Sequence, residues 1–236
     1  MPPRSKAQWK TRLHELWRNW GLFFLIMLIG VTSFRSAIAD WNDVPTGSMI
    51  PTILKGERIF VNRLAYDLKV PYTRLRLATW GDPKRGDVVI CRSPVDGTRL
   101  VKRVIGLPGD EIAMRDNRLH INGHPISYSA LSREEAMDRG GIDSPAFRYH
   151  EEQLPGRAHS IGLQPRKRAL RSFDPLRIPS GSFFVMGDNR DNSADSRFFG
   201  CVERRDIMGE AKAVVVSVDP DRHWQPRWSR FFSRLD

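Results

Sequence analysis

Residues 100–105, Leu-Val-Lys-Arg-Val-Ile, form an apolar run that two basic side chains interrupt, and Gly106 follows the run. Side chains of the β-branched type fit the pleated, half-buried surface of a strand. Because successive side chains of a strand point to opposite faces, Lys102 and Val104 share one face. The pattern therefore predicts a strand that can bury a lysine beside apolar residues.

Similar short runs recur along the chain after residue 40, bounded by Gly, Pro or Asp. They predict strands at 58–61, 87–91, 183–186 and 213–218. Residues 119–126 indicate a hairpin, because their central Asn-Gly pair accepts the positive φ angles of a type I′ turn. This part of the chain is therefore expected to be mostly β.

The stretch 127–178 is different, since its periodicity fades and its charge rises. It indicates a loop-rich insertion, with a short helix expected only at 131–139.

Composition bounds the class of protein. The 236 residues are 40% hydrophobic and 28% charged, which is a globular composition and excludes a wholly disordered chain. The two cysteines, Cys91 and Cys201, do not form a C-x-x-C motif, which excludes zinc ribbons and iron–sulfur clusters. One disulfide between them is still an open alternative. The net charge of +11 indicates an anionic partner, either lipid headgroups or nucleic acid.

A long uncharged run lies near the amino terminus. Residues 19–34 reach about 24 Å as a helix, short of a hydrocarbon core of roughly 30 Å. Arg35 can place its guanidinium among the headgroups, which extends the segment to Ala39. We therefore expect one transmembrane helix over 19–39. The basic segment 1–18 places the amino terminus in the cytoplasm and the rest of the chain outside.

Two alternatives for this segment remain open. Ala37-Ile38-Ala39 has the small-x-small form of a signal-peptide cleavage site, so the segment could be a cleavable secretory signal. A buried helix of a soluble protein is the other alternative.

Residues 44–52, Val-Pro-Thr-Gly-Ser-Met-Ile-Pro-Thr, begin four residues beyond Asp40, so Ser48 is expected just outside the bilayer. A serine becomes a good nucleophile only when a neighbouring base takes its proton. None of the six histidines has a catalytic-looking context. Lys102 can serve if burial keeps it neutral, since lowering a lysine pKa from 10.4 to about 8 costs roughly 3 kcal/mol. An ordinary loop serine and a solvated strand lysine are the simpler alternatives.

Four motifs occur in a fixed order and together resemble the signature boxes of bacterial type I signal peptidases. They are Pro-Thr-Gly-Ser-Met-Ile-Pro-Thr at 45–52, Arg-Gly-Asp-Val-Val at 85–89, Val-Lys-Arg-Val-Ile-Gly-Leu-Pro-Gly-Asp at 101–110 and Gly-Asp-Asn-Arg-Asp-Asn-Ser-Ala-Asp-Ser-Arg at 187–197. The resemblance runs from the apolar segment to about Val218, and residues 127–178 match little.

The resemblance implies a membrane-bound serine endopeptidase that removes N-terminal signal peptides from exported preproteins after small-x-small sites. Its location would be the bacterial inner membrane, with the catalytic domain on the periplasmic side. The expected fold is a mostly antiparallel β-sheet catalytic core, interrupted by a smaller β-rich or loop-rich subdomain. The expected segments after the helix are a core over 40–110 and 179–221, an insertion over 111–178 and a basic aromatic tail over 222–236.

The resemblance also assigns roles. Ser48 is the expected nucleophile and Lys102 the general base, while Thr46 supplies an oxyanion-hole hydroxyl beside the Ser48 amide. Ser193 corresponds to a hydroxyl near the lysine amine. Two further groups of residues are implied, a site-shaping ion pair of Asp195 and Arg197, and substrate pocket walls at Val44, Met49, Ile53, Leu100 and Val101.

No cofactor or metal is expected. The acidic stretch 188–195 suggests a Ca²⁺ loop, but a loop starting at Asp191 would place Ser196 where glycine is required and Val202 where an acid is required. The stretch is therefore expected to form a turn.

The expected partners are preprotein signal peptides and anionic lipid headgroups, and no nucleic acid is expected. The tail alternates aromatic rings and arginines, which suits a membrane interface, although packing of these rings onto the domain is an equal alternative. A dedicated peptidase of the same family that processes one pilin or conjugation protein stays open, as does a non-enzymatic membrane-tethered basic protein. A self-cleaving repressor should instead carry a DNA-binding helical domain, which the sequence lacks.

Overall fold

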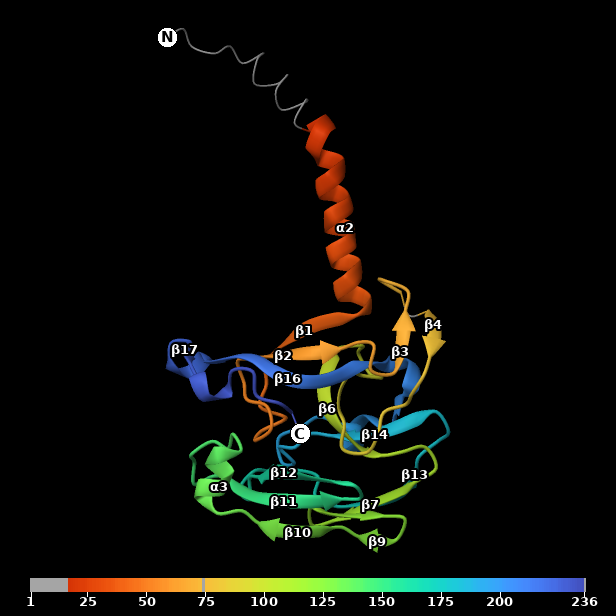
Figure 1. The fold of residues 1–236 in the computed structure, drawn as a ribbon. Coiled ribbons are helices and arrows are strands. Elements are labelled where there is room, and N and C mark those ends of the chain that lie inside the picture. The colour runs from red at the N-terminus through yellow and green to blue at the C-terminus, as the bar shows by residue number, and fades with distance from the viewer. Residues whose placement is uncertain (1–16, 74, 236) are drawn as a thin grey trace.

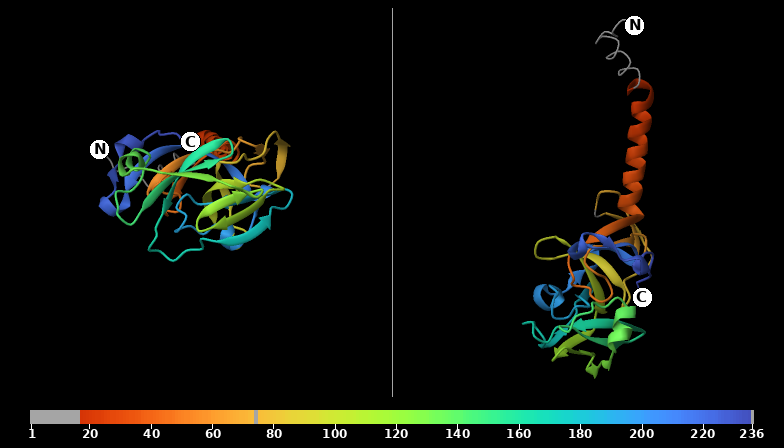
Figure 2. Two further views of the ribbon diagram at one scale, coloured as in Figure 1. Left: turned by 90° about the horizontal axis from the view of Figure 1, so that it is seen from below. Right: turned by 90° about the vertical axis from the view of Figure 1, so that its left-hand side faces the viewer.

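A computed structural model of the protein describes residues 17–73 and 75–235 (Figure 1). A β-rich body carries one long helix, which projects from it as a stalk in both perpendicular side views (Figures 1 and 2). The helical segments are the π-helical turn η1 (Trp17–Gly21), α2 (Leu22–Ala37), α3 (Arg133–Asp138), α4 (Ser196–Phe199) and the 3-10 turns η2 (Arg204–Asp206), η3 (Pro220–Arg222) and η4 (Trp228–Arg230).

Seventeen strands make up four sheets of the described residues. They are β1 (Ala39–Val44), β2 (Glu57–Asn62), β3 (Asp67–Lys69), β4 (Arg76–Thr79), β5 (Val88–Arg92), β6 (Arg99–Gly106), β7 (Glu111–Arg115), β8 (Arg118–Ile121), β9 (His124–Pro125), β10 (Ser127–Ala130), β11 (Arg148–Leu154), β12 (Arg157–Leu163), β13 (Phe173–Arg177), β14 (Ser182–Met186), β15 (Val202–Glu203), β16 (Ile207–Asp219) and β17 (Gln225–Pro226).

The main sheet is antiparallel, with the strand order β1-β2-β16-β5-β6-β14-β15 and β17 paired to β16. It curls so that β1 approaches β6, although three strands separate them in the order. Arg99 Nη1 of β6 lies 3.4 Å from Asn42 Oδ1 of β1. The mostly β, antiparallel fold expected from the sequence is therefore confirmed.

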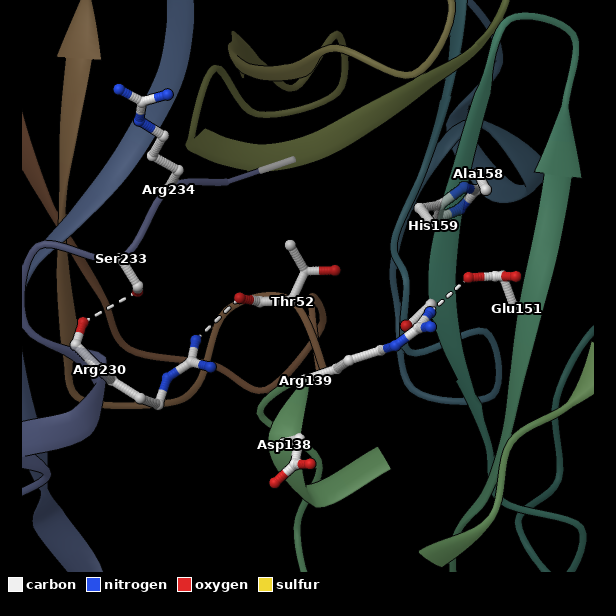
Figure 3. Close-up of a pocket in the computed structure, with 10 residues that line it drawn as sticks. Thr52, Asp138, Arg139, Glu151, Ala158, His159, Arg230, Ser233 and Arg234 are labelled. Atoms are coloured by element: carbon white, nitrogen blue, oxygen red, sulfur yellow. Dashed lines mark hydrogen bonds and ion pairs between the residues drawn. The ribbon is translucent and has the colours of Figure 1, made fainter. Parts of the chain in front are cut away.

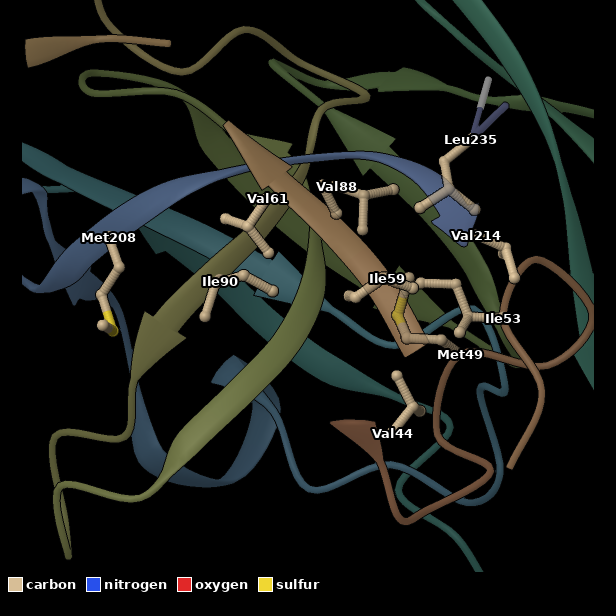
Figure 4. Close-up of a cluster of buried hydrophobic side chains, with 11 residues drawn as sticks. Val44, Met49, Ile53, Ile59, Val61, Val88, Ile90, Met208, Val214 and Leu235 are labelled. Atoms are coloured by element: carbon tan, nitrogen blue, oxygen red, sulfur yellow. The ribbon is translucent and has the colours of Figure 1, made fainter. Parts of the chain in front are cut away.

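A core of buried apolar side chains lies inside this curl (Figure 4). Ile59 of β2 and Val214 of β16 are fully buried there, because the two strands present their apolar positions to the same side. Met49 and Ile53 enter the same cluster from the loop between β1 and β2. The loop that carries Ser48 is thus anchored to the main core by its own side chains.

The insertion holds the sheets β10-β11-β12 and β13-β7-β8-β9. The Asn122-Gly123 turn has φ angles of 52° and 79°, which confirms the predicted hairpin. The fading periodicity at 127–178 gave no sign of β11 and β12, which pair over seven residues each. The reason is that β11 buries Glu152, whose carboxylate bonds to Arg190, so a polar residue occupies an inward position. Helix α3 starts at a capping box on Ser132 and ends at Asp138.

Helix α2 ends two residues before the predicted boundary, because Ala39 pairs with Asn62 as the first residue of β1. From Leu22 to Ile29 every side chain is large and apolar, and each is 52–65% exposed. None of the helices in the described part of the chain meets both the length and the hydropathy that crossing a membrane requires. Most of the predicted basic segment 1–18 lies outside the described residues.

The C-terminal tail follows two patterns. Trp224, Trp228 and Phe232 are largely exposed, whereas Leu235 is buried in the main core.

Cys91 and Cys201 are both free thiols, which answers the question that the sequence left open.

Candidate active site

Ser48 lies in the loop between β1 and β2, and several backbone bonds shape that loop. Ile50 N donates to Gly47 O over 3.3 Å, and Ile53 N donates to Met49 O over 2.9 Å. Met49 is fully buried directly after the serine. A side chain anchored in the core next to Ser48 limits how far the serine can move, so the loop presents its hydroxyl in a fixed direction.

Lys102 meets this hydroxyl from β6. Its Nζ lies 2.9 Å from Ser48 Oγ and donates a second bond to Val101 O, also over 2.9 Å. Lys102 is only 3% exposed, and its strand position lies opposite the fully buried Val89 of β5. The strand pattern in the sequence therefore predicted correctly that this run buries a lysine.

Burial lowers the pKa of Lys102, because the low-dielectric interior disfavours an ammonium ion. The negative charge of Asp195 opposes this shift and the positive charge of Arg197 assists it. The net effect is a lowered pKa, which increases the fraction of neutral amine, the form that can accept a proton from serine. Among the described residues that line the cleft there is no histidine to compete for this role.

The Gly-Asp segment after β14 packs against the backbone of the serine loop. Asn189 N donates to Ser48 O over 3.0 Å, and its side-chain Nδ2 donates to Gly47 O over 2.9 Å. A Cβ on Gly187 would lie 2.4 Å from Ser48 O and 2.3 Å from Ser193 Oγ, so only glycine allows this approach. Asn189 lies within the motif at 187–197, but no role in the site was predicted for it.

Ser193 is close to the segment that braces the loop. Its hydroxyl lies at the position a Gly187 side chain would occupy. In the part of the chain that the structure describes, Lys102 Nζ bonds to Ser48 and Val101, and Ser193 is not among its partners. The role of Ser193 toward the amine stays a prediction.

Asp195 and Arg197 form a fully buried, bidentate ion pair. Arg197 Nε and Nη2 each donate to an Asp195 oxygen over 2.8 Å, and Gly187 N donates to Asp195 Oδ2 over 3.0 Å. Burial favours the protonated carboxyl, but the bonds and charge of Arg197 outweigh it and lower the pKa of Asp195. The carboxylate therefore remains charged and holds Gly187 in place beside Ser48.

A second buried ion pair lies on the other face of β6. Arg103 Nε and Nη2 donate to the two Asp188 oxygens over 2.9 and 2.8 Å, and Thr52 Oγ1 donates to Asp188 Oδ2 over 2.5 Å. The side chains of both charged residues are fully buried. This pair joins β6 and the Gly-Asp segment to the serine loop. The alternation of β6 signalled it, since Arg103 faces away from Lys102.

The dyad opens into a cleft of about 110 Å³ between β1 and β6. Five predicted residues line it beside Lys102, namely Val44, Thr46, Ser48, Leu100 and Val101. Met49 and Ile53, the other two predicted pocket walls, are buried in the core behind the loop and are not among the residues that line this cleft, so their role toward the substrate stays a prediction. Ile90, which was not predicted as a pocket wall, also lines the cleft because β5 pairs it directly with Val101.

Comparison with known proteins finds matches to a single family of proteases. The family model described as "Signal peptidase, peptidase S26" matches residues 17–216. Signal peptidase I of Pseudomonas aeruginosa is 34% identical over 234 residues, covering 94% of this chain and 80% of the relative. Signal peptidase I P of Bacillus subtilis subsp. natto is 34% identical over 206 residues, covering 87% of this chain and 92% of the relative.

A crystal structure of a signal peptidase I from Enterococcus faecalis V583 matches this chain with a sequence identity of 31% and a TM-score of 0.34. The match covers 56% of this chain and 98% of the chain in the crystal structure.

Proposed function

The chain belongs to the signal peptidase family, peptidase S26, and acts as a signal peptidase I, and we propose that Ser48 and Lys102 form its catalytic dyad. One observation supports this assignment above all, the 2.9 Å contact between Lys102 Nζ and Ser48 Oγ at a nearly dry amine. A proton can pass directly over such a distance.

In the proposed mechanism Lys102 accepts the Ser48 proton while the serine oxygen attacks the scissile carbonyl carbon. The Ser48 amide and the Thr46 hydroxyl stabilise the oxyanion, and one such donor is worth about 2.7–4 kcal/mol in comparable sites. Lys102 then gives its proton to the leaving amine. The neutral Lys102 amine then activates the water that hydrolyses the acyl-enzyme, so one base serves both steps.

We propose that the substrate enters as an additional strand between β1 and β6. Among the described strands, β1 pairs only with β2, and residues 99–102 of β6 pair only with β5, so both offer backbone groups to the cleft. Val44, Leu100 and Val101 leave little room there. Such walls accept alanine and exclude large side chains, as cleavage after small-x-small sites requires.

The membrane anchor is also part of the proposal. The eight consecutive large apolar side chains from Leu22 to Ile29 are all exposed, and such a surface needs an apolar surrounding. We propose that η1 and α2 hold the chain in the bacterial inner membrane, with the basic segment 1–18 in the cytoplasm and the β-rich body on the periplasmic side. Anionic lipid headgroups would then meet the arginines of this basic chain.

Replacing Ser48 tests the assignment directly. We expect Ser48→Ala to lower the kcat for a preprotein by at least about 10⁴-fold, since the nucleophile is lost. Ser127→Ala is the control, because Ser127 is exposed in β10. Normal turnover by a folded Ser48→Ala enzyme would exclude Ser48 as nucleophile. Cleavage of a panel of preproteins, mapped by mass spectrometry, would separate a general peptidase from one dedicated to a pilin or conjugation protein.

A further inference from the structure

The end of the chain packs against the loop that carries the nucleophile, although well over 150 residues separate them in the sequence. We propose that Arg230, in the C-terminal tail, is a positioning residue that holds the Ser48 loop in its reactive geometry. The proposal rests on the dyad of Ser48 and Lys102 described above. Neither the motifs nor the composition of the tail indicated such a role.

Arg230 bonds to both the backbone and the boundary of this loop. Its Nη2 donates to Thr52 O over 2.9 Å and to Glu57 Oε2 over 3.0 Å, and its Nε donates to Glu57 Oε1. Figure 3 shows the contact with Thr52 at the edge of a cavity of about 410 Å³. The planar guanidinium thus connects a carbonyl four residues after Ser48 with the first residue of β2.

Glu57 extends this connection into the loop and the main sheet. Its side chain is fully buried and accepts a bond from Leu54 N over 2.8 Å and from Ser217 Oγ of β16 over 2.8 Å. A buried carboxylate needs a cation nearby, and Arg230 supplies it. The loop is therefore fixed at Thr52 and at Leu54 by one ion pair.

The insertion fixes Arg230 from a further direction. A Cβ on Gly140, just after α3, would lie 2.0 Å from Arg230 Nη1 and 2.8 Å from Pro51 O. Gly140 also has a φ of +90°, which favours glycine. The guanidinium therefore has little freedom to leave Thr52.

The tail that carries Arg230 is itself anchored. Leu235 is 7% exposed and shares the main core with Met49 and Ile53 of the serine loop (Figure 4). Its backbone N donates to Lys212 O over 3.0 Å, and Ser233 O accepts a bond from Val214 N over 2.8 Å. The tail thus lies along β16, and Arg230 acts from a rigid support.

The backbone of the loop is therefore braced at two places, besides the Arg103–Asp188 pair that holds the Thr52 side chain. Asn189 holds its backbone at Gly47 and Ser48, and Arg230 holds it at Thr52. Reaction rates depend steeply on such geometry, since a misplacement of about 1 Å can cost about 10²-fold in rate. Weakening the Arg230 brace should shift Ser48 relative to Lys102 while leaving the cleft walls in place.

The test compares Arg230→Lys with Arg227→Lys. A lysine can keep one bond to Glu57 but cannot also reach Thr52 O with a planar fork. Arg227 lies in the same tail but contacts the serine loop only at its far end, where it donates to Lys55 O over 3.2 Å, and it also donates to Val218 O of β16 over 2.8 Å. We expect Arg230→Lys to lower kcat for a preprotein by about 10-fold to 10²-fold with KM within about twofold, and Arg227→Lys to change neither.

Two further measurements separate positioning from loss of fold. The folded fraction at the assay temperature is determined by circular dichroism, and kcat is expressed per folded molecule. The acid limb of the pH profile should stay unchanged, because the surroundings of the Lys102 amine are intact. If Arg230→Lys does not fold, Glu57→Gln/Arg230→Gln removes both charges of the pair, and we expect the same selective loss of kcat.

Equal kcat per folded molecule in Arg230→Lys and Arg227→Lys would overturn the inference. So would a loss confined to KM. Failure of the dyad assignment is recognised separately, since Ser48→Ala would then keep its activity whatever Arg230 does.

Discussion

The β-rich body and helix α2 differ from most soluble domains in opposite ways, the body by burying charged side chains and the helix by exposing apolar ones. The body buries charged side chains, with Lys102 only 3% exposed and Arg103 and Asp188 fully buried. Helix α2, which projects from the body (Figure 1), instead exposes every one of the eight consecutive large apolar side chains from Leu22 to Ile29. In most soluble domains charges stay outside and a helix keeps one apolar face inward.

The difference shows what each region is built for. Arg103 and Asp188 are paired, so their burial fixes geometry. Lys102 has a serine hydroxyl and a carbonyl as partners, so its burial changes its protonation. The large apolar side chains from Leu22 to Ile29 are exposed, as the proposed membrane anchor requires.

Replacing Lys102 by a cation that cannot lose its proton should have the largest effect on activity, because it tests whether burial of the amine serves catalysis. We expect Lys102→Arg to lower kcat about 10³-fold at every pH from 6 to 9, because a guanidinium cannot act as a base. Lys69→Arg is a matched control, since Lys69 is partly buried and lies outside the cleft. A kcat of Lys102→Arg that recovers with rising pH would contradict a role for Lys102 as the base.

Charging α2 should have the next largest effect. Each lysine costs about 2.5–3.5 kcal/mol at a bilayer centre, so Leu25→Lys/Ile29→Lys should lower partition into phosphatidylglycerol-containing vesicles by at least about 100-fold. Cleavage of a short soluble peptide should stay unchanged. Leu176→Lys, in β13 of the body, is the control and should bind vesicles normally. Normal sedimentation of the double variant with vesicles would exclude α2 as the anchor.

The smallest expected change concerns the apolar surroundings of the amine. Cys91 is fully buried, and burial raises the pKa of its thiol to about 12. The charge of Lys102 acts on this thiol in the opposite direction. A serine there would place a more polar hydroxyl near the ammonium form and stabilise it, which we expect to raise the lysine pKa by up to about one unit.

Because the neutral amine is the active form, the acid limb of the pH profile of Cys91→Ser should therefore move to higher pH. Cys201→Ser, half-buried elsewhere, should leave the profile unchanged. A shift to lower pH in Cys91→Ser would show that the thiol position does not control the polarity around Lys102.

The main strands could be predicted because their signals are local. Alternating apolar residues and Gly or Pro boundaries marked β2, β5 and β6, and Asn122-Gly123 marked a hairpin. The motifs also indicated Ser48 and Lys102 as a pair, through resemblance. Strands β11 and β12 escaped prediction because an ion pair between distant residues makes the polar Glu152 an interior residue.

By itself the sequence determined the main strands and the apolar segment, because these depend on neighbours along the chain, and the resemblance of its motifs indicated the two residues proposed for catalysis. Only the tertiary structure decided that Met49 and Ile53 point into the core, that Ile90 lines the cleft and that Arg230 reaches Thr52. These contacts depend on how the main sheet curls and where the tail returns. Such contacts join residues far apart in the chain, and their energy exists only once the whole sheet has formed.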